Sequence, residues 1–258
     1  MPDSFEQKLR SAMEALGRVV ESIIGKAKEA RVQVGVRSGV QPLLSVDGLL
    51  KTERIRDLID ISTQKVMGNA FPNIRGGNAL EVGEGPPAYN DRMLSAQARM
   101  AVGVEIGGRS TERQGDISRG FVVRGQLLKL PFGDGRFSYV LARLATSFQS
   151  DMLRSMRELN RVMMFGGQGV VIDYHPFGLY SRKGMGHARP VDSGIHKLED
   201  YYRMYRSIGL RVVDVREAFI DEGMRQFFKE EEIPAYRNLK GTPLLIFLFI
   251  YKPKAAVS

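Results

Sequence analysis

The chain has 258 residues, no cysteine, and 38 lysines and arginines against 29 acidic residues, which gives a formal charge of +9. This length suits one large α/β domain with an appendage, and the lack of cysteine excludes disulfides and thiolate metal sites and favours a cytoplasmic protein. The charge favours an anionic partner, such as RNA, an acidic metabolite, a carrier-bound acyl group or a membrane surface, without choosing among them.

The first segment predicts an amphipathic helix, because its apolar residues recur every three or four positions. We assign residues 1–50 to an N-terminal helical appendage and residues 51–258 to the main domain. The simplest role for the appendage is packing on the flank of that domain; a homodimer contact, a lid over the substrate and membrane-surface binding are the alternatives. The apolar positions are Phe5, Leu9, Met13, Leu16, Val20 and Ile23.

The rest of the chain alternates between strand and helix patterns. Such alternation predicts an α/β fold with helices on both faces of a mostly parallel sheet. The longest apolar run, Pro243–Tyr251, is about half as long as a membrane-spanning helix, so we expect a strand there and no membrane span. The expected strands lie near Ala79–Val82, Ala101–Glu105, Gly120–Val123, Phe137–Leu141, Gly169–Asp173, Leu210–Val215 and Leu244–Tyr251, and the expected helices near Leu49–Lys65, Asn90–Ala98, Asp151–Met163 and Lys197–Ile208.

The stretch Asn78–Pro87, NALEVGEGPP, carries the first functional signal. An apolar run followed by Gly-x-Gly is typical of a buried strand that delivers a ligand to a tight turn, and prolines are tolerated in the first turn of a following helix. A second apolar run ends on Glu105, about 20 residues later, where a nucleotide-binding unit places a carboxylate for ribose hydroxyls. This spacing fits a dinucleotide-binding fold equally well.

Two further blocks separate these readings. Gly125–Val140, GQLLKLPFGDGRFSYV, resembles the LPF-x-D-x-x-F-D-x-V block of class I S-adenosylmethionine-dependent methyltransferases of the type 11 kind. Met156–Gly167, MRELNRVMMFGG, resembles their E-x-x-R-V-L-K-P-G-G block. The resemblance spans roughly residues 78–251. It implies a seven-stranded sheet whose last strand is antiparallel, and S-adenosylmethionine as the cofactor.

The resemblance also implies a role for each matching residue. The two glycines approach the methionine part of the cofactor, the first glutamate orients its amino group, and the second accepts from its ribose. Glutamine and leucine follow the third strand at the adenine, and alanine and arginine at the end of the fourth strand line the other side. These cofactor-binding residues are Glu81, Gly83, Gly85, Glu105, Gln126, Leu127, Ala142 and Arg143.

The sequence departs from the family pattern at four positions. Pro86 and Pro87 replace small residues and remove two amide donors, Ser138 replaces an aspartate and Phe165 a proline. Such altered cofactor loops also occur in proteins that keep a fold and change its function.

The substrate side is expected in a loop at residues 174–196. His175 follows the fifth strand beside the crevice, where a histidine can act as a general base near neutral pH, so we predict it as the catalytic residue. His187 and His196 are weaker candidates, and no metal site is expected. The same region interleaves cations with rings, which is typical of nucleic-acid binding but also suits an anionic small substrate. These residues are Tyr180, Arg182, Lys183, Arg189, Lys197, Tyr201, Tyr202, Arg203, Tyr205 and Arg206.

The sequence therefore predicts S-adenosylmethionine-dependent methyl transfer to an oxygen, nitrogen or carbon atom of a small or medium organic acceptor. An RNA acceptor and a cofactor-binding protein without methyl transfer are the two alternatives.

Overall fold

The computed structural model describes residues 49, 54–68, 74–84, 87–106, 120–145, 151–178 and 197–254. The chain divides into two units, Met1–Pro42 and Leu43–Ser258, and all the described residues belong to the second. The predicted N-terminal appendage helix, and with it the six apolar positions that define it, lies outside the described residues. So do residues 179–196 of the predicted substrate loop, with His187 and His196.

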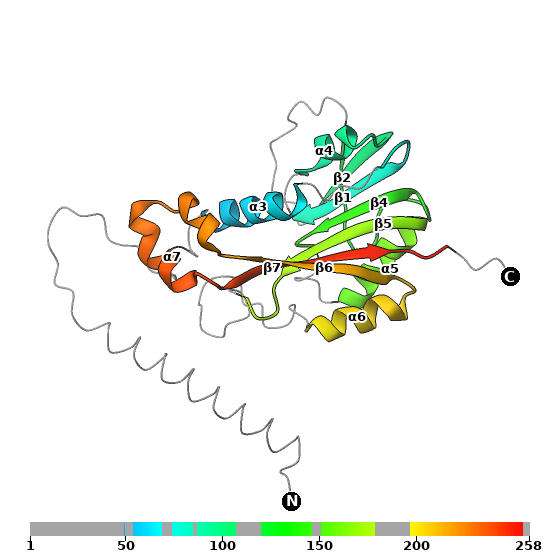
Figure 1. The fold of residues 1–258 in the computed structure, drawn as a ribbon. Coiled ribbons are helices and arrows are strands. Elements are labelled where there is room, and N and C mark those ends of the chain that lie inside the picture. Colours follow the sequence, from blue (N-terminus) through cyan, green and yellow to red (C-terminus); the bar gives the residue numbers. More distant parts are fainter. Residues whose placement is uncertain are drawn as a thin grey trace, which may run out of the picture. The chain divides into compact units, whose positions relative to one another are not determined.

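Seven strands form one sheet in the order β3-β2-β1-β4-β5-β7-β6 (Figure 1). Strands β1 to β5 pair in parallel, and β7 is antiparallel to both of its neighbours. The predicted seven-stranded, mostly parallel sheet with an antiparallel last strand is therefore confirmed. The strands are β1 Asn78–Glu84, β2 Met100–Ile106, β3 Gly120–Arg124, β4 Phe137–Arg143, β5 Met163–Tyr174, β6 Arg211–Phe219 and β7 Pro243–Tyr251.

The described helices flank this sheet, and none of them is long and apolar enough to cross a membrane. Helix α4 begins at Asn90, where the helix expected near Asn90–Ala98 begins. Asp151 caps α5, because its Oδ1 accepts the N–H of Arg154 at 2.9 Å. The helices are α3 Arg54–Met67, α4 Asn90–Ser95, α5 Met152–Val162, α6 Leu198–Ser207 and α7 Ile233–Leu239, with 3-10 turns η2 Glu222–Phe227 and η3 Glu230–Glu232.

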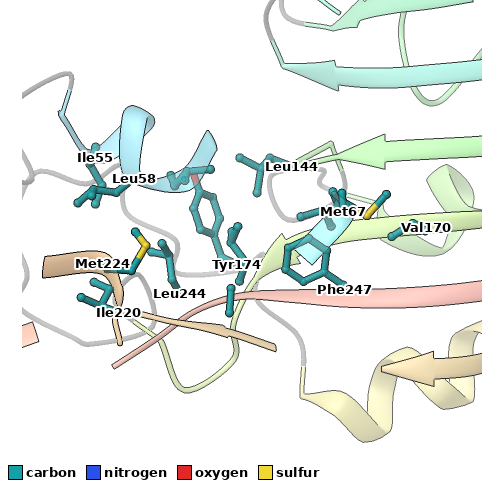
Figure 2. Packing of buried hydrophobic residues seen from close by; sticks show 14 of the residues in the cluster. Ile55, Leu58, Met67, Leu144, Val170, Tyr174, Ile220, Met224, Leu244 and Phe247 are labelled. Atoms are coloured by element: carbon teal, nitrogen blue, oxygen red, sulfur yellow. The ribbon is translucent and has the colours of Figure 1, made fainter. Parts of the chain in front are cut away.

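The first core cluster lies between the sheet and helices α3, α4 and α7. Figure 2 shows Leu58 and Met67 of α3 with Tyr174 of β5 and Phe247 of β7 in this cluster. The apolar residues of α3 recur at helical spacing, so one face of the helix is buried while its charged face stays outside. Helix α3 contacts β6 and β7 of the sheet.

The second core cluster lies on the opposite face, under α5 and α6. Tyr201 and Tyr205 of α6 stack with their ring centroids 6.5 Å apart. The Tyr201 hydroxyl also donates to Oδ2 of the fully buried Asp173 of β5 at 3.1 Å. A buried carboxylate requires such a donor, so this bond fixes α6 against the sheet.

Candidate active site

The strand register brings four predicted or neighbouring site positions into one row. Gly83 of β1 pairs with Glu105 of β2 on one side and with Arg143 of β4 on the other, and Glu105 pairs with Arg124 of β3. All four lie at or next to the carboxyl ends of parallel strands, which is the edge where open α/β sheets bind ligands.

Gly83 allows a close approach between β1 and β4. A Cβ atom at this position would lie 3.0 Å from the carbonyl oxygen of Arg143 and 3.6 Å from its Nη2. A larger residue would push the two strand ends apart, so the glycine is required by the packing as well as by any ligand. Gly85 lies outside the described residues.

Glu81 is only 1% exposed and anchors the chain that follows β1. Its carboxylate accepts the backbone N–H groups of Ala88 and Tyr89 at 3.0 and 2.7 Å. Arg143 Nε lies 3.4 Å from the same carboxylate. Burial raises the pKa of Glu81, while Arg143 and the two amides act in the opposite direction. This geometry gives Glu81 a role in holding the turn; the predicted contact with the cofactor's amino group stays a prediction.

Gly103 explains how the proline-containing turn fits against the sheet. A Cβ atom at Gly103 would lie 2.0 Å from Cγ of Pro87 and 3.3 Å from Nδ2 of Asn90. The proline ring therefore occupies the space that a side chain on β2 would need.

Replacing Gly103 by alanine is expected to displace the Pro87 turn and to destabilise the protein by about 1–3 kcal/mol, the usual cost of overpacking. Urea unfolding measures this loss. Gly223→Ala is the control, because its added Cβ would meet only the side-chain ends of Asp221 and Lys65, both at 3.3 Å. Equal stability of the two variants would show that the turn does not depend on the absence of a side chain at Gly103.

Glu105 and Arg143 are charged residues in this row of paired strand positions. The side chain of Glu105 is partly exposed, and among the described residues no side chain forms an ion pair or hydrogen bond with its carboxylate. A carboxylate in this state is ready to accept from a ligand hydroxyl. Arg143 is 9% exposed, and its charge also acts on Asp60 of α3 and on Tyr89. Burial raises the pKa of Tyr89 to about 12, so this phenol stays neutral.

Leucine and alanine among the predicted cofactor residues are more buried than a ligand contact requires. Leu127 is 1% exposed and Ala142 is fully buried, and both belong to the second core cluster. Gln126 is exposed, and its carbonyl accepts the N–H of Lys129 at 3.0 Å, which closes a tight turn next to β3.

Leu144 directly follows the row at the end of β4. Its φ of 50° lies in the left-handed region, which is costly for a leucine. The side chain is nevertheless held in the first core cluster, and its N–H donates to the carbonyl of Ile172 at 2.8 Å (Figure 2). Strain of this kind is found where the surrounding structure fixes a functional turn.

His175 lies just beyond the end of β5 and is 5% exposed. Its Nε2 is 2.7 Å from Oε1 of Glu217 on β6, and its Nδ1 accepts the N–H of Phe177 at 3.1 Å. The amide can only donate, so Nδ1 is the acceptor and Nε2 carries the proton toward the carboxylate. Base catalysis by His175 stays a prediction. It requires that the hydrogen bond from the Phe177 N–H to Nδ1 breaks, so that Nδ1 can accept a proton from the substrate.

The predicted cation and ring set is only partly accessible. Tyr201 and Tyr205 are buried in the second core cluster, so the expectation that they could stack on bases is wrong. Tyr202 is 46% exposed, and Lys197, Arg203 and Arg206 are exposed. The other four members of the set lie outside the described residues.

Sequence reasoning missed two residues that shape the site. Gly103 had a usable signal, since a glycine inside an apolar strand often marks a close approach of another segment. Glu217 had none, because it is 42 positions away from His175 and lies on a strand that mixes charged and apolar residues.

The strand order, the antiparallel last strand and the glutamate and glycine positions at the carboxyl edge together define a class I methyltransferase fold. Residues 80–171 match the family described as "Methyltransferase domain". The match agrees, over these residues, with the predicted resemblance to a methyltransferase.

Solved structures with low sequence identity share the fold. One, described as an S-adenosylmethionine-dependent methyltransferase from Listeria monocytogenes, has a TM-score of 0.61 at 11% identity and covers 77% of this chain and 100% of its own. A second, an S-adenosylmethionine-dependent methyltransferase from Mesorhizobium loti, has a TM-score of 0.54 at 15% identity and covers 72% of this chain and 96% of its own. A third is the [4+2]-cyclase SpnF, with a TM-score of 0.52 at 15% identity, covering 85% of this chain and 100% of its own. No curated protein matches the sequence.

Proposed function

We propose that this protein transfers the methyl group of S-adenosylmethionine to an oxygen, nitrogen or carbon atom of a small or medium organic acceptor. The observation that carries the proposal is the row in which Gly83 pairs with both Glu105 and Arg143 at the carboxyl edge of the sheet. This row combines a close backbone approach, an accepting carboxylate and a buried cation.

The proposed cofactor contacts follow from the chemistry of each side chain. Glu105 would accept from the ribose hydroxyls, since its carboxylate is partly exposed. Arg143 would pair with the carboxylate of the methionine part, because a guanidinium matches a carboxylate through two parallel hydrogen bonds. Gln126 and the backbone at Leu127 would contact the adenine, and Gly83 and Gly85 would leave room for the methionine chain.

S-adenosylmethionine supplies a methyl group on a positively charged sulfur, and the acceptor displaces it in line. Charge is lost in this reaction, so the protein contributes chiefly by aligning the acceptor and by excluding water. A base is needed only for acceptors that must lose a proton. We propose His175 for that role, with Glu217 orienting its ring through Nε2–H as the third group of a catalytic triad does.

Two alternatives remain open. The likeness to a structure named a [4+2]-cyclase illustrates that this fold is not tied to one reaction, so binding without methyl transfer is the first. An RNA acceptor is the second, although two of the tyrosines expected to stack on bases, Tyr201 and Tyr205, are buried in the core. Cytoplasmic location and an anionic small-molecule substrate are part of the main proposal.

Saturation with S-adenosylhomocysteine is expected to stabilise the protein, by roughly 2.7 kcal/mol at about 100 times the dissociation constant. A thermal melt measures this shift, and nicotinamide dinucleotides at the same concentration are the control.

Glu105→Ala should weaken the binding of S-adenosylhomocysteine by about 1.5–3 kcal/mol with the fold intact, which is the scale of a lost charged hydrogen bond. If neither S-adenosylmethionine nor S-adenosylhomocysteine raises the melting temperature of the wild-type protein, the proposed function is overturned.

Transfer of a labelled methyl group from S-adenosylmethionine into a cell extract separates the alternatives. Label in the small-molecule fraction that survives nuclease treatment supports the main proposal. Label that disappears with nuclease indicates RNA, and cofactor binding without any transfer indicates the non-catalytic alternative.

A further inference from the structure

The chain between β3 and β4, residues 125–136, crosses from one strand to the next without a helix. Its first part is a tight turn that carries Gln126 and Leu127. Gly125 N–H donates to the carbonyl of Glu105 at 3.3 Å, so the turn is also bonded to the residue proposed for the ribose. A segment with no helix of its own needs other bonds to keep one conformation.

Arg161 at the end of α5 supplies most of these bonds. Its Nη1 donates to the carbonyl of Phe132 and to Oδ1 of Asp134, both at 2.7 Å, and its Nη2 donates to the carbonyl of Leu130 at 3.2 Å. The remaining donors go to Glu158, from Nε at 2.8 Å and from Nη2 at 2.6 Å. All five N–H donors of the guanidinium are therefore used.

Glu158 completes the contact from the same helix. Its Oε1 accepts the backbone N–H of Leu130 at 2.7 Å, so Leu130 is held through both its N–H and its carbonyl. The Arg161 guanidinium lowers the pKa of Glu158, and the paired carboxylates raise the pKa of Arg161. The pair is therefore ionised at neutral pH, and its stabilising contribution is lost only as the pH falls through the lowered pKa of Glu158.

The held segment reaches back to the turn. Pro131, next to Leu130, lies close to Gly125, since a Cβ atom on Gly125 would be 3.6 Å from Cδ of Pro131 and 2.9 Å from Val104. Leu127 and Leu130 are both buried in the second core cluster. The turn is thus closed on itself, and its position relative to Glu105 depends on where α5 holds Leu130.

We propose that Glu158 and Arg161 are positioning residues for the adenosine end of the cofactor, acting through the turn at Gln126 and Leu127. The inference rests on the proposed function. It gives the E-x-x-R block a physical role that is separate from cofactor contact. The ion pair holds the segment between β3 and β4, which has no helix of its own, in one conformation.

Arg161→Gln is expected to weaken S-adenosylhomocysteine about 10-fold and to reduce the preference for it over S-inosylhomocysteine, in which a carbonyl replaces the adenine amine, at least about 3-fold. Isothermal calorimetry measures both affinities. The matched control is Arg157→Gln, which changes an exposed arginine of the same helix and should alter neither value. If the glutamine variant does not fold, Arg161→Lys keeps the charge but cannot make five bonds, and should show the same loss of preference.

Loss of both affinities by the same factor would overturn the inference, because a general loss of structure does not distinguish the two bases. So would a wild-type protein that binds S-adenosylhomocysteine without preference for its base. A wild-type protein that binds neither compound would instead overturn the proposed function.

Discussion

Glu81→Ala is expected to lower the free energy of unfolding by about 3–5 kcal/mol, the range seen when one partner of a buried ion pair is removed. The change takes away the acceptor of the Ala88 and Tyr89 N–H groups and the carboxylate beside Arg143. Domains of this kind are stable by about 5–15 kcal/mol, so the loss is a large part of the total. Urea unfolding, followed by circular dichroism, measures it.

Asp214→Ala is the control for this experiment, since it removes an exposed ion pair with Arg216 and should cost no more than about 1 kcal/mol. Glu81→Gln keeps one accepting oxygen and is expected to cost about 1–3 kcal/mol. A loss below about 1 kcal/mol for Glu81→Ala would show that the turn is held by other contacts.

The pH dependence of stability gives a second measurement at Glu81. Burial raises its pKa, so the folded protein holds this proton more tightly than the unfolded chain does. The contribution to stability is therefore fully present below the unfolded pKa, about 4.3 for a glutamate, and is lost as the pH rises through the folded pKa. Glu81→Gln has no proton to lose and should lack this part of the slope.

The fold could be predicted from the sequence because its signals are local. Each apolar run, such as the one that ends at Glu105, became a strand, and the blocks at residues 125–140 and 156–167 lie within the part of the chain that matches a methyltransferase domain. The strand register and the partners of Glu81 could not be predicted, because they depend on how a turn folds back on the sheet. A carboxylate after an apolar run has the same local appearance whether it contacts a ligand or two backbone amides.

In α6 the spacing of the tyrosines predicts a buried face, whereas their aromatic character favours base stacking. Tyr201 and Tyr205 are four residues apart, with Leu198 and Ile208 three residues to either side, which is the spacing of a buried helical face. Composition drew attention to rings and cations, while periodicity already indicated the core. Where the two signals disagree on a helix, burial of the face is the stronger physical effect.

His175→Ala is expected to lower turnover by about 10²–10⁴-fold for an acceptor that must lose a proton, while the dissociation constant for S-adenosylhomocysteine stays unchanged. The reason is the pair with Glu217 at 2.7 Å, which orients the ring and would stabilise its protonated form once Nδ1 has taken a proton. Glu217→Gln keeps the size of the side chain but removes its charge, and should lower turnover by a smaller factor.

The competing role for His175 is structural, since the ring joins the end of β5 to β6 and both of its nitrogens are used in the folded protein. A structural role predicts a lower melting temperature for His175→Ala with only a few-fold loss of turnover. Steady-state kinetics and a melt on the same preparation distinguish the two. An acceptor that carries its negative charge before binding needs no base, so turnover on such a substrate should survive His175→Ala, whereas turnover on its protonated counterpart should not.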